Sequence, residues 1–227
     1  MWEARLDAPA EPRLESTLSA DERARGDRFL LPRDGHRFRR GRALLRAILG
    51  EYLDEDPARL RIECGGHGKP RLAGGRCQFN LSHSHDVMLV AVAAACVGVD
   101  VERIRPLADP ERVAERFFSD AERSALASVS PRRRPEAFFR CWTRKEAFVK
   151  ATGRGLSVPL RAFDVGLDET QGRARLDVRG HDEGGRWSLW GLPAAPGHCA
   201  ALVAEVPIER VRHGRWAERS FRSKRSL

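Results

Sequence analysis

The sequence of 227 residues lacks the features that mark thiolate metal proteins, disulfide-bonded proteins and membrane-spanning proteins. Its five cysteines lie far apart with no C-x-x-C pair, which argues against a zinc site and a disulfide framework. The longest apolar run, residues 87–99, is shorter than the roughly 20 residues that cross a bilayer. The first residues contain acids and prolines where a signal peptide would have an apolar core. We therefore expect a cytoplasmic protein with reduced thiols and no membrane partner.

Lysine is also scarce, although the chain is strongly basic. The formal net charge is +9, yet only four of the 41 basic residues are lysines. Such a positive charge favours an acidic partner or a polyanionic ligand. Lysine is a compact point charge that arginine does not replace everywhere. Lys69, Lys145 and Lys150 are therefore candidates for functional positions.

The pattern of helix and strand signals predicts an α+β fold with two similar halves, each a helical block followed by strands. We place the N-terminal half at 1–103, the C-terminal half at 104–206 and a basic tail at 207–227, whose residues from Glu209 onward should fray. Helices are expected to begin at capping boxes at 19–22 and 119–122, and at the Asp-Pro pair 109–110; apolar periods also predict helix over 33–53 and up to Gly153. Strands are expected at 1–7, 59–64, 77–82, 87–93, 97–102, 163–165, 173–178, 187–192 and 199–203, and a loop at the glycine-rich segment 65–75.

Two acidic residues alternate at the end of an apolar strand, in Val97-Gly-Val-Asp-Val-Glu102. On a strand, Asp100 and Glu102 project from the same face, about 7 Å apart. Two carboxylates in this position can share a hard cation such as Mg²⁺, which prefers oxygen ligands. A charged, solvated strand end explains the same pattern, and both interpretations stay open on spacing alone.

The segment 142–150 places a carboxylate and an ammonium on one helix face. Trp142, Glu146 and Lys150 follow one another at intervals of four residues. An ordinary ion pair beside a core tryptophan explains this spacing, and taken alone is the commoner arrangement. If Glu146 joins the acidic pair at one metal, however, Lys150 lies one turn farther on, where it can face a bound phosphate. Metal plus lysine at a phosphate is the recurring arrangement of phosphoryl transfer.

The segment 79–85 ends a predicted strand in side chains that donate hydrogen bonds, among them Ser82, His83 and His85. Hydroxyl and imidazole groups there would suit phosphate oxygens. The two histidines could instead form a metal pair on one strand face, although no third soft ligand is evident, and a solvated turn is a further alternative.

Taken in order, these segments resemble the 4′-phosphopantetheinyl transferases of the Sfp (surfactin-synthetase-activating) type, over roughly residues 19–165. The matching motifs are GKP at 68–70, FNLSHS at 79–84, GVDVE at 98–102, RFFS at 116–119 with Glu122, WTRKEAFVK at 142–150 and GRGLSVP at 153–159.

The resemblance implies transfer of the 4′-phosphopantetheine arm of coenzyme A to a serine of a carrier protein, with release of adenosine 3′,5′-bisphosphate. It also implies a duplicated fold of pseudo-twofold halves that works as a monomer, with the site between the halves. Carried over by position, the Mg²⁺ ligands, with Mn²⁺ as an alternative ion, are Asp100, Glu102 and Glu146, while Lys150 contacts the leaving phosphate. The residues implied to bind coenzyme A are Arg25, Arg37, Lys69, Ser82, His83 and Lys150.

The resemblance also bears on two acidic residues outside the proposed metal site. Glu22 stands where relatives often have a lysine for the 3′-phosphate, which shifts that task to Arg25 and His83. The serine of the carrier must lose a proton as it attacks, and Glu146, Glu122 or a water is the candidate acceptor, with Glu146 favoured.

The expected partners are acidic carrier proteins of polyketide, nonribosomal peptide or fatty-acid synthases, which a chain at +9 attracts. Two alternatives are a basic nucleic-acid-binding protein, which leaves the acidic groups unexplained, and a catalytically inactive relative that binds carriers.

Overall fold

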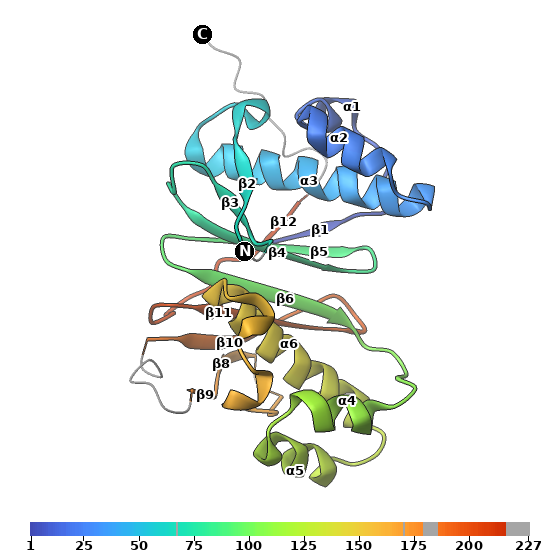
Figure 1. Cartoon of the computed structure of the whole chain (residues 1–227), viewed down its shortest axis with the longest axis vertical. Helices are drawn as coiled ribbons and strands as arrows, with labels where there is room; N and C mark the ends of the chain where they lie inside the picture. Colours follow the sequence, from blue (N-terminus) through green and yellow to red (C-terminus); the bar gives the residue numbers. More distant parts are fainter. Residues whose placement is uncertain (67, 170, 179–185, 217–227) are drawn as a thin grey trace.

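The chain forms two α+β halves whose sheets face each other. The structure is a computed structural model, and it describes residues 1–66, 68–169, 171–178 and 186–216. Figure 1 shows helices α1 to α3 at one end of the molecule, α4 and α5 at the other, and the strands of both halves between them. The N-terminal half contains β1 (Trp2–Arg5), α1 (Pro12–Glu15), α2 (Ala20–Asp27), α3 (Pro32–Leu53), β2 (Ile62–Cys64), β3 (Pro70–Leu72), β4 (Gln78–Ser84) and β5 (Val87–Ala93). The remainder contains β6 (Val97–Arg103), α4 (Pro110–Phe117), α5 (Asp120–Ser128), α6 (Arg134–Thr152), β7 (Phe163–Val165), β8 (Gly172–Ala174), β9 (Leu176–Val178), β10 (Ser188–Leu192), β11 (His198–Ala204) and β12 (Gly214–Arg215).

Each half has a sheet, a long helix and a core of its own. The N-terminal sheet has the order β12-β1-β5-β4, and the C-terminal sheet has the order β6-β11-β10-β8. Helix α3 buries an apolar stripe that includes Leu45 and Ile48 against the first sheet. Helix α6 does the same in the second core with Phe148, and ends at Gly153, whose φ of 68° is the left-handed conformation that stops helices. Both predicted capping boxes are formed, at the starts of α2 and α5.

A third core joins the two halves. It contains Leu89 of β5 together with Val99 and Val101 of β6, all of them fully buried. Because strand side chains alternate, burial of Val99 and Val101 on one face of β6 places Asp100 and Glu102 on the opposite face. That face looks toward α6, and it carries the acidic pair.

Three expectations differ from the structure. Strand β6 pairs with β11 along residues 97–103, so it belongs to the C-terminal sheet, whereas the boundary was expected after residue 103. The glycine-rich segment 65–75 is not wholly a loop, because it contains β3, which pairs with the preceding strand β2. Of the tail that was expected to fray from Glu209 onward, residues 209–216 are described, and they end against the N-terminal half. Strand β12 returns to pair with β1, and Trp216 packs edge-on against Trp2. The rest of the expected tail, 217–227, lies outside the described residues.

The other elements lie close to their predicted places, with two differences. The segment 59–64 is strand only at Ile62–Cys64, after a 3-10 helix at Pro57–Arg59, and the segment 173–178 is divided between β8 and β9. None of the described helices is both long and apolar enough to cross a membrane.

Candidate functional site

The acidic face of β6 lies against the backbone of α6. Gly98 makes this approach possible, because a Cβ atom at this position would lie 2.1 Å from the carbonyl oxygen of Ala147. Two residues farther along β6, Asp100 meets the last turns of α6. The strand and the helix thus pack backbone to backbone at Gly98, and their polar side chains gather just beyond that contact.

Asp100 is the centre of the group. It is 2% exposed, and its Oδ1 accepts hydrogen bonds from Lys150 Nζ at 2.6 Å and from Ser82 Oγ at 2.8 Å. Its other oxygen, Oδ2, is buried and has no hydrogen-bond partner among the described residues. Buried polar atoms are rarely left without a partner, and a carboxylate oxygen least of all. An unsatisfied carboxylate oxygen at this place is suited to a bound cation.

The charge of Asp100 acts on both Glu102 and Glu146. Burial raises the pKa of Glu146, the charges of Asp100 and Glu102 raise it further, and Lys150 opposes them. Burial and the charge of Asp100 likewise raise the pKa of Glu102, against the hydrogen bond from Ser84 Oγ at 3.1 Å. The structure therefore brings together the acidic residues predicted as metal ligands and places Lys150 among them.

The orientation of α6 is set by cations on the sides of the helix away from β6. Lys145 is fully buried and forms an ion pair of 2.8 Å with Glu122. The guanidinium of Arg144 donates to two oxygens of Asp168, to Oδ1 at 3.0 Å and to the carbonyl oxygen at 2.9 Å. With these residues anchored in the C-terminal half, Glu146 turns toward the strand.

Strand β4 borders the site with a row of polar side chains that also bind the backbone of β6. The amide of Val99 donates to Asn80 Oδ1 at 2.8 Å, and the amide of Arg103 donates to Ser84 Oγ at 3.0 Å. Ser82, between them, donates to Asp100 and accepts from Lys150. The motif predicts a phosphate contact for Ser82 and gives no role to Asn80 and Ser84, although the three residues alternate along the sequence as residues of one strand face do.

A positive region adjoins this border on the face of β4 toward α3. His83 is exposed, and partial desolvation followed by the charges of Lys150 and Arg37 lowers the pKa of its imidazole. Arg37 bonds Asp7 through two nitrogens, at 2.6 and 2.7 Å. Arg25 is exposed and lies over the ring of Phe38. Arg37, His83 and Lys150 thus interact electrostatically, whereas no described contact joins Arg25 to them.

Two predicted site residues are engaged elsewhere. Glu122 is buried in the C-terminal half, where it bonds Lys145, the Ser119 amide and the Val165 amide, so it has no access to a substrate proton. Its expected role as an alternative base does not fit this position. Lys69 directs its ammonium at backbone carbonyls of α6 and β6, with Nζ–O distances of 2.7 Å to Lys150 and 2.9 Å to Val97.

Glu22 is also held inside the protein. Its carboxylate accepts from Arg42 and Arg46 and from the amide of Ser19. Burial by itself raises the pKa of Glu22, but the two arginines and the Ser19 amide outweigh burial and lower it. Glu22 is therefore part of the N-terminal framework.

The metal-binding capacity of the acidic group has a limit in its present arrangement. Across residues 1–66, 68–169, 171–178 and 186–216, no three His, Cys, Asp or Glu side chains converge on one point closely enough to hold an ion. Lys150 occupies one oxygen of Asp100 instead. The chemistry of the donors and the unsatisfied Oδ2 still suit a hard divalent cation.

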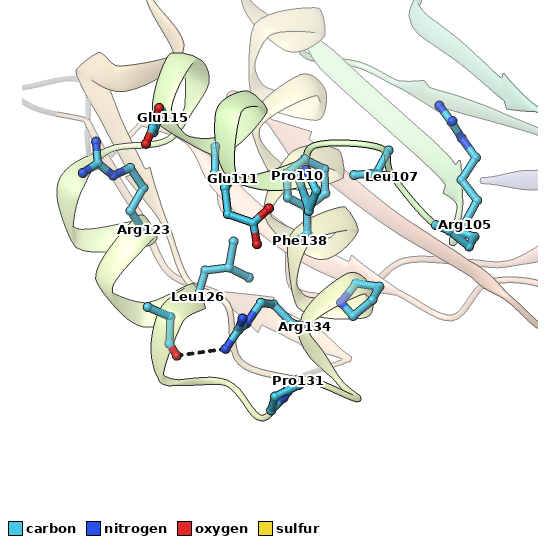
Figure 2. A pocket seen from close by; sticks show the side chains of 14 residues that line it. Arg105, Leu107, Pro110, Glu111, Glu115, Arg123, Leu126, Pro131, Arg134 and Phe138 are labelled. Carbon is cyan, nitrogen blue, oxygen red and sulfur yellow. Dashed lines mark hydrogen bonds between the residues drawn. The ribbon is translucent and has the colours of Figure 1, made fainter.

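A hollow of about 520 Å³ lies beyond the end of β6, between α4, α5 and the start of α6. Figure 2 shows Leu126 and Phe138 lining it, with Glu111 and Arg134 beside them and with Arg105, Glu115 and Arg123 farther out on its rim. The charge of Arg105 opposes the rise in the pKa of Glu102, which links the hollow electrostatically to the acidic group.

Comparison with known proteins gives one consistent result. A family model described as "4'-phosphopantetheinyl transferase superfamily" matches residues 96–203, and one described as "4'-phosphopantetheinyl transferase, N-terminal" matches residues 9–97. The 4'-phosphopantetheinyl transferase HetI of Nostoc sp. is 38% identical over 211 residues, 90% of this chain and 86% of the relative. The 4'-phosphopantetheinyl transferase psf-1 of Bacillus pumilus is 37% identical over 211 residues, which cover 87% of this chain and 89% of the relative.

A third relative, 4'-phosphopantetheinyl transferase Sfp of Bacillus subtilis, is 32% identical over 165 residues, covering 72% of this chain and 73% of the relative. These matches extend over both halves and include the strand and helix that carry the acidic group. The chain therefore belongs to the 4′-phosphopantetheinyl transferase superfamily, as an enzyme of the Sfp type that transfers phosphopantetheine from coenzyme A to carrier proteins.

Proposed function

We propose that transfer in this enzyme depends on a divalent metal ion, Mg²⁺ or Mn²⁺, and releases adenosine 3′,5′-bisphosphate. The observation that carries the proposal is the charge around Asp100. Three carboxylates, those of Asp100, Glu102 and Glu146, lie within electrostatic range of one another. The ammonium of Lys150 bonds Asp100 Oδ1, and Asp100 Oδ2 has no partner among the described residues. The excess negative charge would repel a pyrophosphate, and a divalent cation reverses that repulsion.

The residues that would hold the ion are Asp100 and Glu102 of β6 and Glu146 of α6. A bound divalent ion supplies neutralisation of the pyrophosphate charge, including the charge that grows on the leaving group. Lys150 now compensates Asp100, and its side chain is 29% exposed. Its ammonium can therefore serve the leaving phosphate once Asp100 has another cation to neutralise it.

Coenzyme A is expected to lie over the border of β4. Its phosphates would meet the positive region of Arg37, His83 and Lys150, with Arg25 at the surface nearby in the same half. The Ser82 hydroxyl faces the same border but already bonds Asp100 and Lys150. A contact between Ser82 and a phosphate would thus replace one of these bonds.

Glu146 is the proposed acceptor of the proton from the carrier serine. Its half-buried carboxylate lies beside Asp100 and Lys150, and its raised pKa makes it a stronger base than an exposed glutamate. As the serine oxygen forms its bond to the phosphorus of the phosphopantetheine arm, its proton would pass to Glu146, and the bond from this phosphorus to the leaving bisphosphate would break.

The carrier would approach the end of β6 where the hollow opens. Arg105, Arg123 and Arg134 line it together with Glu111 and Glu115, and the net charge of +9 favours the encounter with an acidic partner. The target class is a carrier of polyketide, nonribosomal peptide or fatty-acid synthesis, and the chain is proposed to act as a monomer with its site between its own halves. The alternative of nucleic-acid binding rests on net charge alone.

The test is transfer of labelled coenzyme A to a panel of apo carriers from the three synthase types, with Mg²⁺, with Mn²⁺ and with EDTA. We expect a mass gain of one phosphopantetheine on at least one carrier and release of the bisphosphate, both dependent on the metal. Undiminished transfer in EDTA would remove the metal from the proposal. Failure with every carrier would contradict transferase activity and favour an inactive carrier-binding protein.

A further inference from the structure

Lys69 ties together the two elements that carry the acidic group. Its Nζ lies 2.9 Å from the carbonyl oxygen of Val97, the first residue of β6. It lies 2.7 and 3.4 Å from the carbonyl oxygens of Lys150 and Ala151, in the last turn of α6. The last carbonyls of a helix have no partner within the helix, and a cation there is favourable. One ammonium thus satisfies the end of α6 and the start of β6 together.

The same place is where the strand and the helix approach most closely. Gly98 follows Val97, and a Cβ atom on Gly98 would lie 2.3 Å from the Ala151 nitrogen. Lys69 therefore bonds the carbonyls that flank the backbone contact. Asp100 lies two residues beyond Gly98, and Glu146 and Lys150 lie on the helix just before the bonded turn. Any slide of α6 along β6 would change the distances between these side chains.

The ammonium of Lys69 has little capacity left for a ligand. It has three protons, and three carbonyl oxygens lie within hydrogen-bonding distance. Burial also lowers its pKa. Gly153, with φ of 68°, lets the chain leave α6 beside the lysine stem, since a Cβ there would lie 3.8 Å from Lys69 Cδ.

We propose that Lys69 is a positioning residue that fixes α6 against β6, and that it does not bind a phosphate of coenzyme A. Acting through the backbone, it sets Glu146 and Lys150 relative to Asp100. The inference rests on the proposed function for its catalytic consequence, whereas the bonds of Lys69 can be tested independently.

The direct test uses the scarcity of lysine. The chain has four lysines, so side-chain ¹⁵N labelling gives a simple spectrum, and Lys69→Met identifies the Lys69 signal. We expect that signal to be protected from exchange with solvent in the free enzyme and to stay protected after Mg²⁺ and coenzyme A are added. Protection that arises only on addition of coenzyme A would make Lys69 a ligand and overturn the inference.

The functional test compares Lys69→Met with Arg71→Met, which removes an exposed charge of the same strand region. In Lys69→Met we expect kcat to fall and the half-saturating Mg²⁺ concentration to rise by about tenfold or more. Coenzyme A affinity measured in EDTA should stay within about twofold of the wild-type value, because no phosphate contact is lost. Arg71→Met should change none of these quantities.

The opposite pattern would overturn the inference, namely coenzyme A affinity in EDTA lowered about tenfold with the Mg²⁺ requirement unchanged. Lys69→Arg, which retains the charge, should recover part of kcat. If Lys69→Met does not fold, Lys69→Arg identifies the Lys69 signal by its loss, and the lysine spectrum of the wild type then decides the question. If the wild type transfers to no carrier, the proposed function fails, and the same spectrum still reports where Lys69 is bonded.

Discussion

The two halves contain the same structural device, built from different residues. In the N-terminal half, Glu22 of a capping box pairs with Arg46 of α3, which also bonds the carbonyls of Pro57 and Leu60. In the C-terminal half, the capping-box residue Glu122 pairs with Lys145 of α6, whose ammonium also bonds two carbonyls of the following segment. Each long helix is thereby fixed to a short helix before it and to the chain after it.

The helices differ at the next residue. Arg46 is followed by the fully buried Ala47, whereas Lys145 is followed by Glu146. Four residues farther on, α3 has Glu51 and α6 has Lys150. The buried ion pair that anchors the long helix is thus present in both halves. The pair of charged residues facing the acidic strand, Glu146 and Lys150, is present only in the C-terminal half. The residues that anchor each long helix are therefore distinct from the residues that place charged groups beside the acidic strand.

The largest effect should follow from Glu146→Gln. Loss of a general base costs about 10²- to 10⁴-fold in rate, and here it also removes a proposed metal ligand. Transfer measured under single-turnover conditions should fall by this amount, while the fold is retained. Glu51→Gln, which removes an exposed carboxylate of α3 at the place that Lys150 has on α6, is the control and should leave transfer unchanged. Equal losses in both variants would show that the halves share the chemistry.

Breaking the buried ion pairs should affect the halves unequally. Lys145→Met leaves Glu122 without its cation at a site that is 1% exposed, which costs about 3–5 kcal/mol of unfolding free energy. Arg46→Met leaves Glu22 still paired with Arg42, so we expect a smaller loss of about 1–3 kcal/mol. Urea unfolding measures both values. A larger loss in Arg46→Met would reverse the comparison.

The acid dependence of stability should depend on Glu22. Its folded-state pKa is lowered, so its ion pairs stabilise the protein above the usual glutamate pKa, and this stabilisation is lost as the pH falls through the lowered value. The wild type should therefore lose stability more steeply than Glu22→Gln between pH 5 and the lowered pKa. Parallel curves from urea unfolding at a series of pH values would contradict this assignment.

The smallest effects concern the joint between the halves. In Asn80→Ala the buried amide of Val99 loses its acceptor, and we expect a loss of about 1–3 kcal/mol. Ser84→Ala should cost less, about 0.5–1 kcal/mol, because the Arg103 amide is exposed and water can replace the hydroxyl. Calorimetric unfolding of both variants compares them. Equal costs would mean that burial does not distinguish the two bonds.

Local signals were sufficient for most of the fold. The capping boxes, the helical period of α3 and the apolar alternation of β6 each depend on neighbours in the chain, and they predicted the elements closely. They left the grouping of Asp100, Glu102, Glu146 and Lys150 open, and the family resemblance of the motifs is what implied it. What they could not predict depends on distant contacts. Strand β12 exists because Trp216 reaches Trp2, and β3 exists because β2 lies beside it.

The roles of individual polar residues were harder to predict for the same reason. A lysine after a glycine is equally suited to a phosphate and to the carbonyls at the end of a helix, and only the fold shows which partners are near Lys69. Likewise, Glu122 is competent as a base by its chemistry, and its burial beside Lys145 is what excludes that role.

The joint between β4 and β6 has a consequence for the solubility of the separate halves. Each of these strands is the last of its sheet, and each edge is covered by the other, partly through Asn80, Ser82 and Ser84. Uncovered sheet edges pair readily with other chains. Dividing the protein in the turn between β5 and β6 would expose the outer amides of β6 and the apolar faces of β5 and β6 together. The separated halves should therefore aggregate, so the contact that forms the site also protects the protein from self-association.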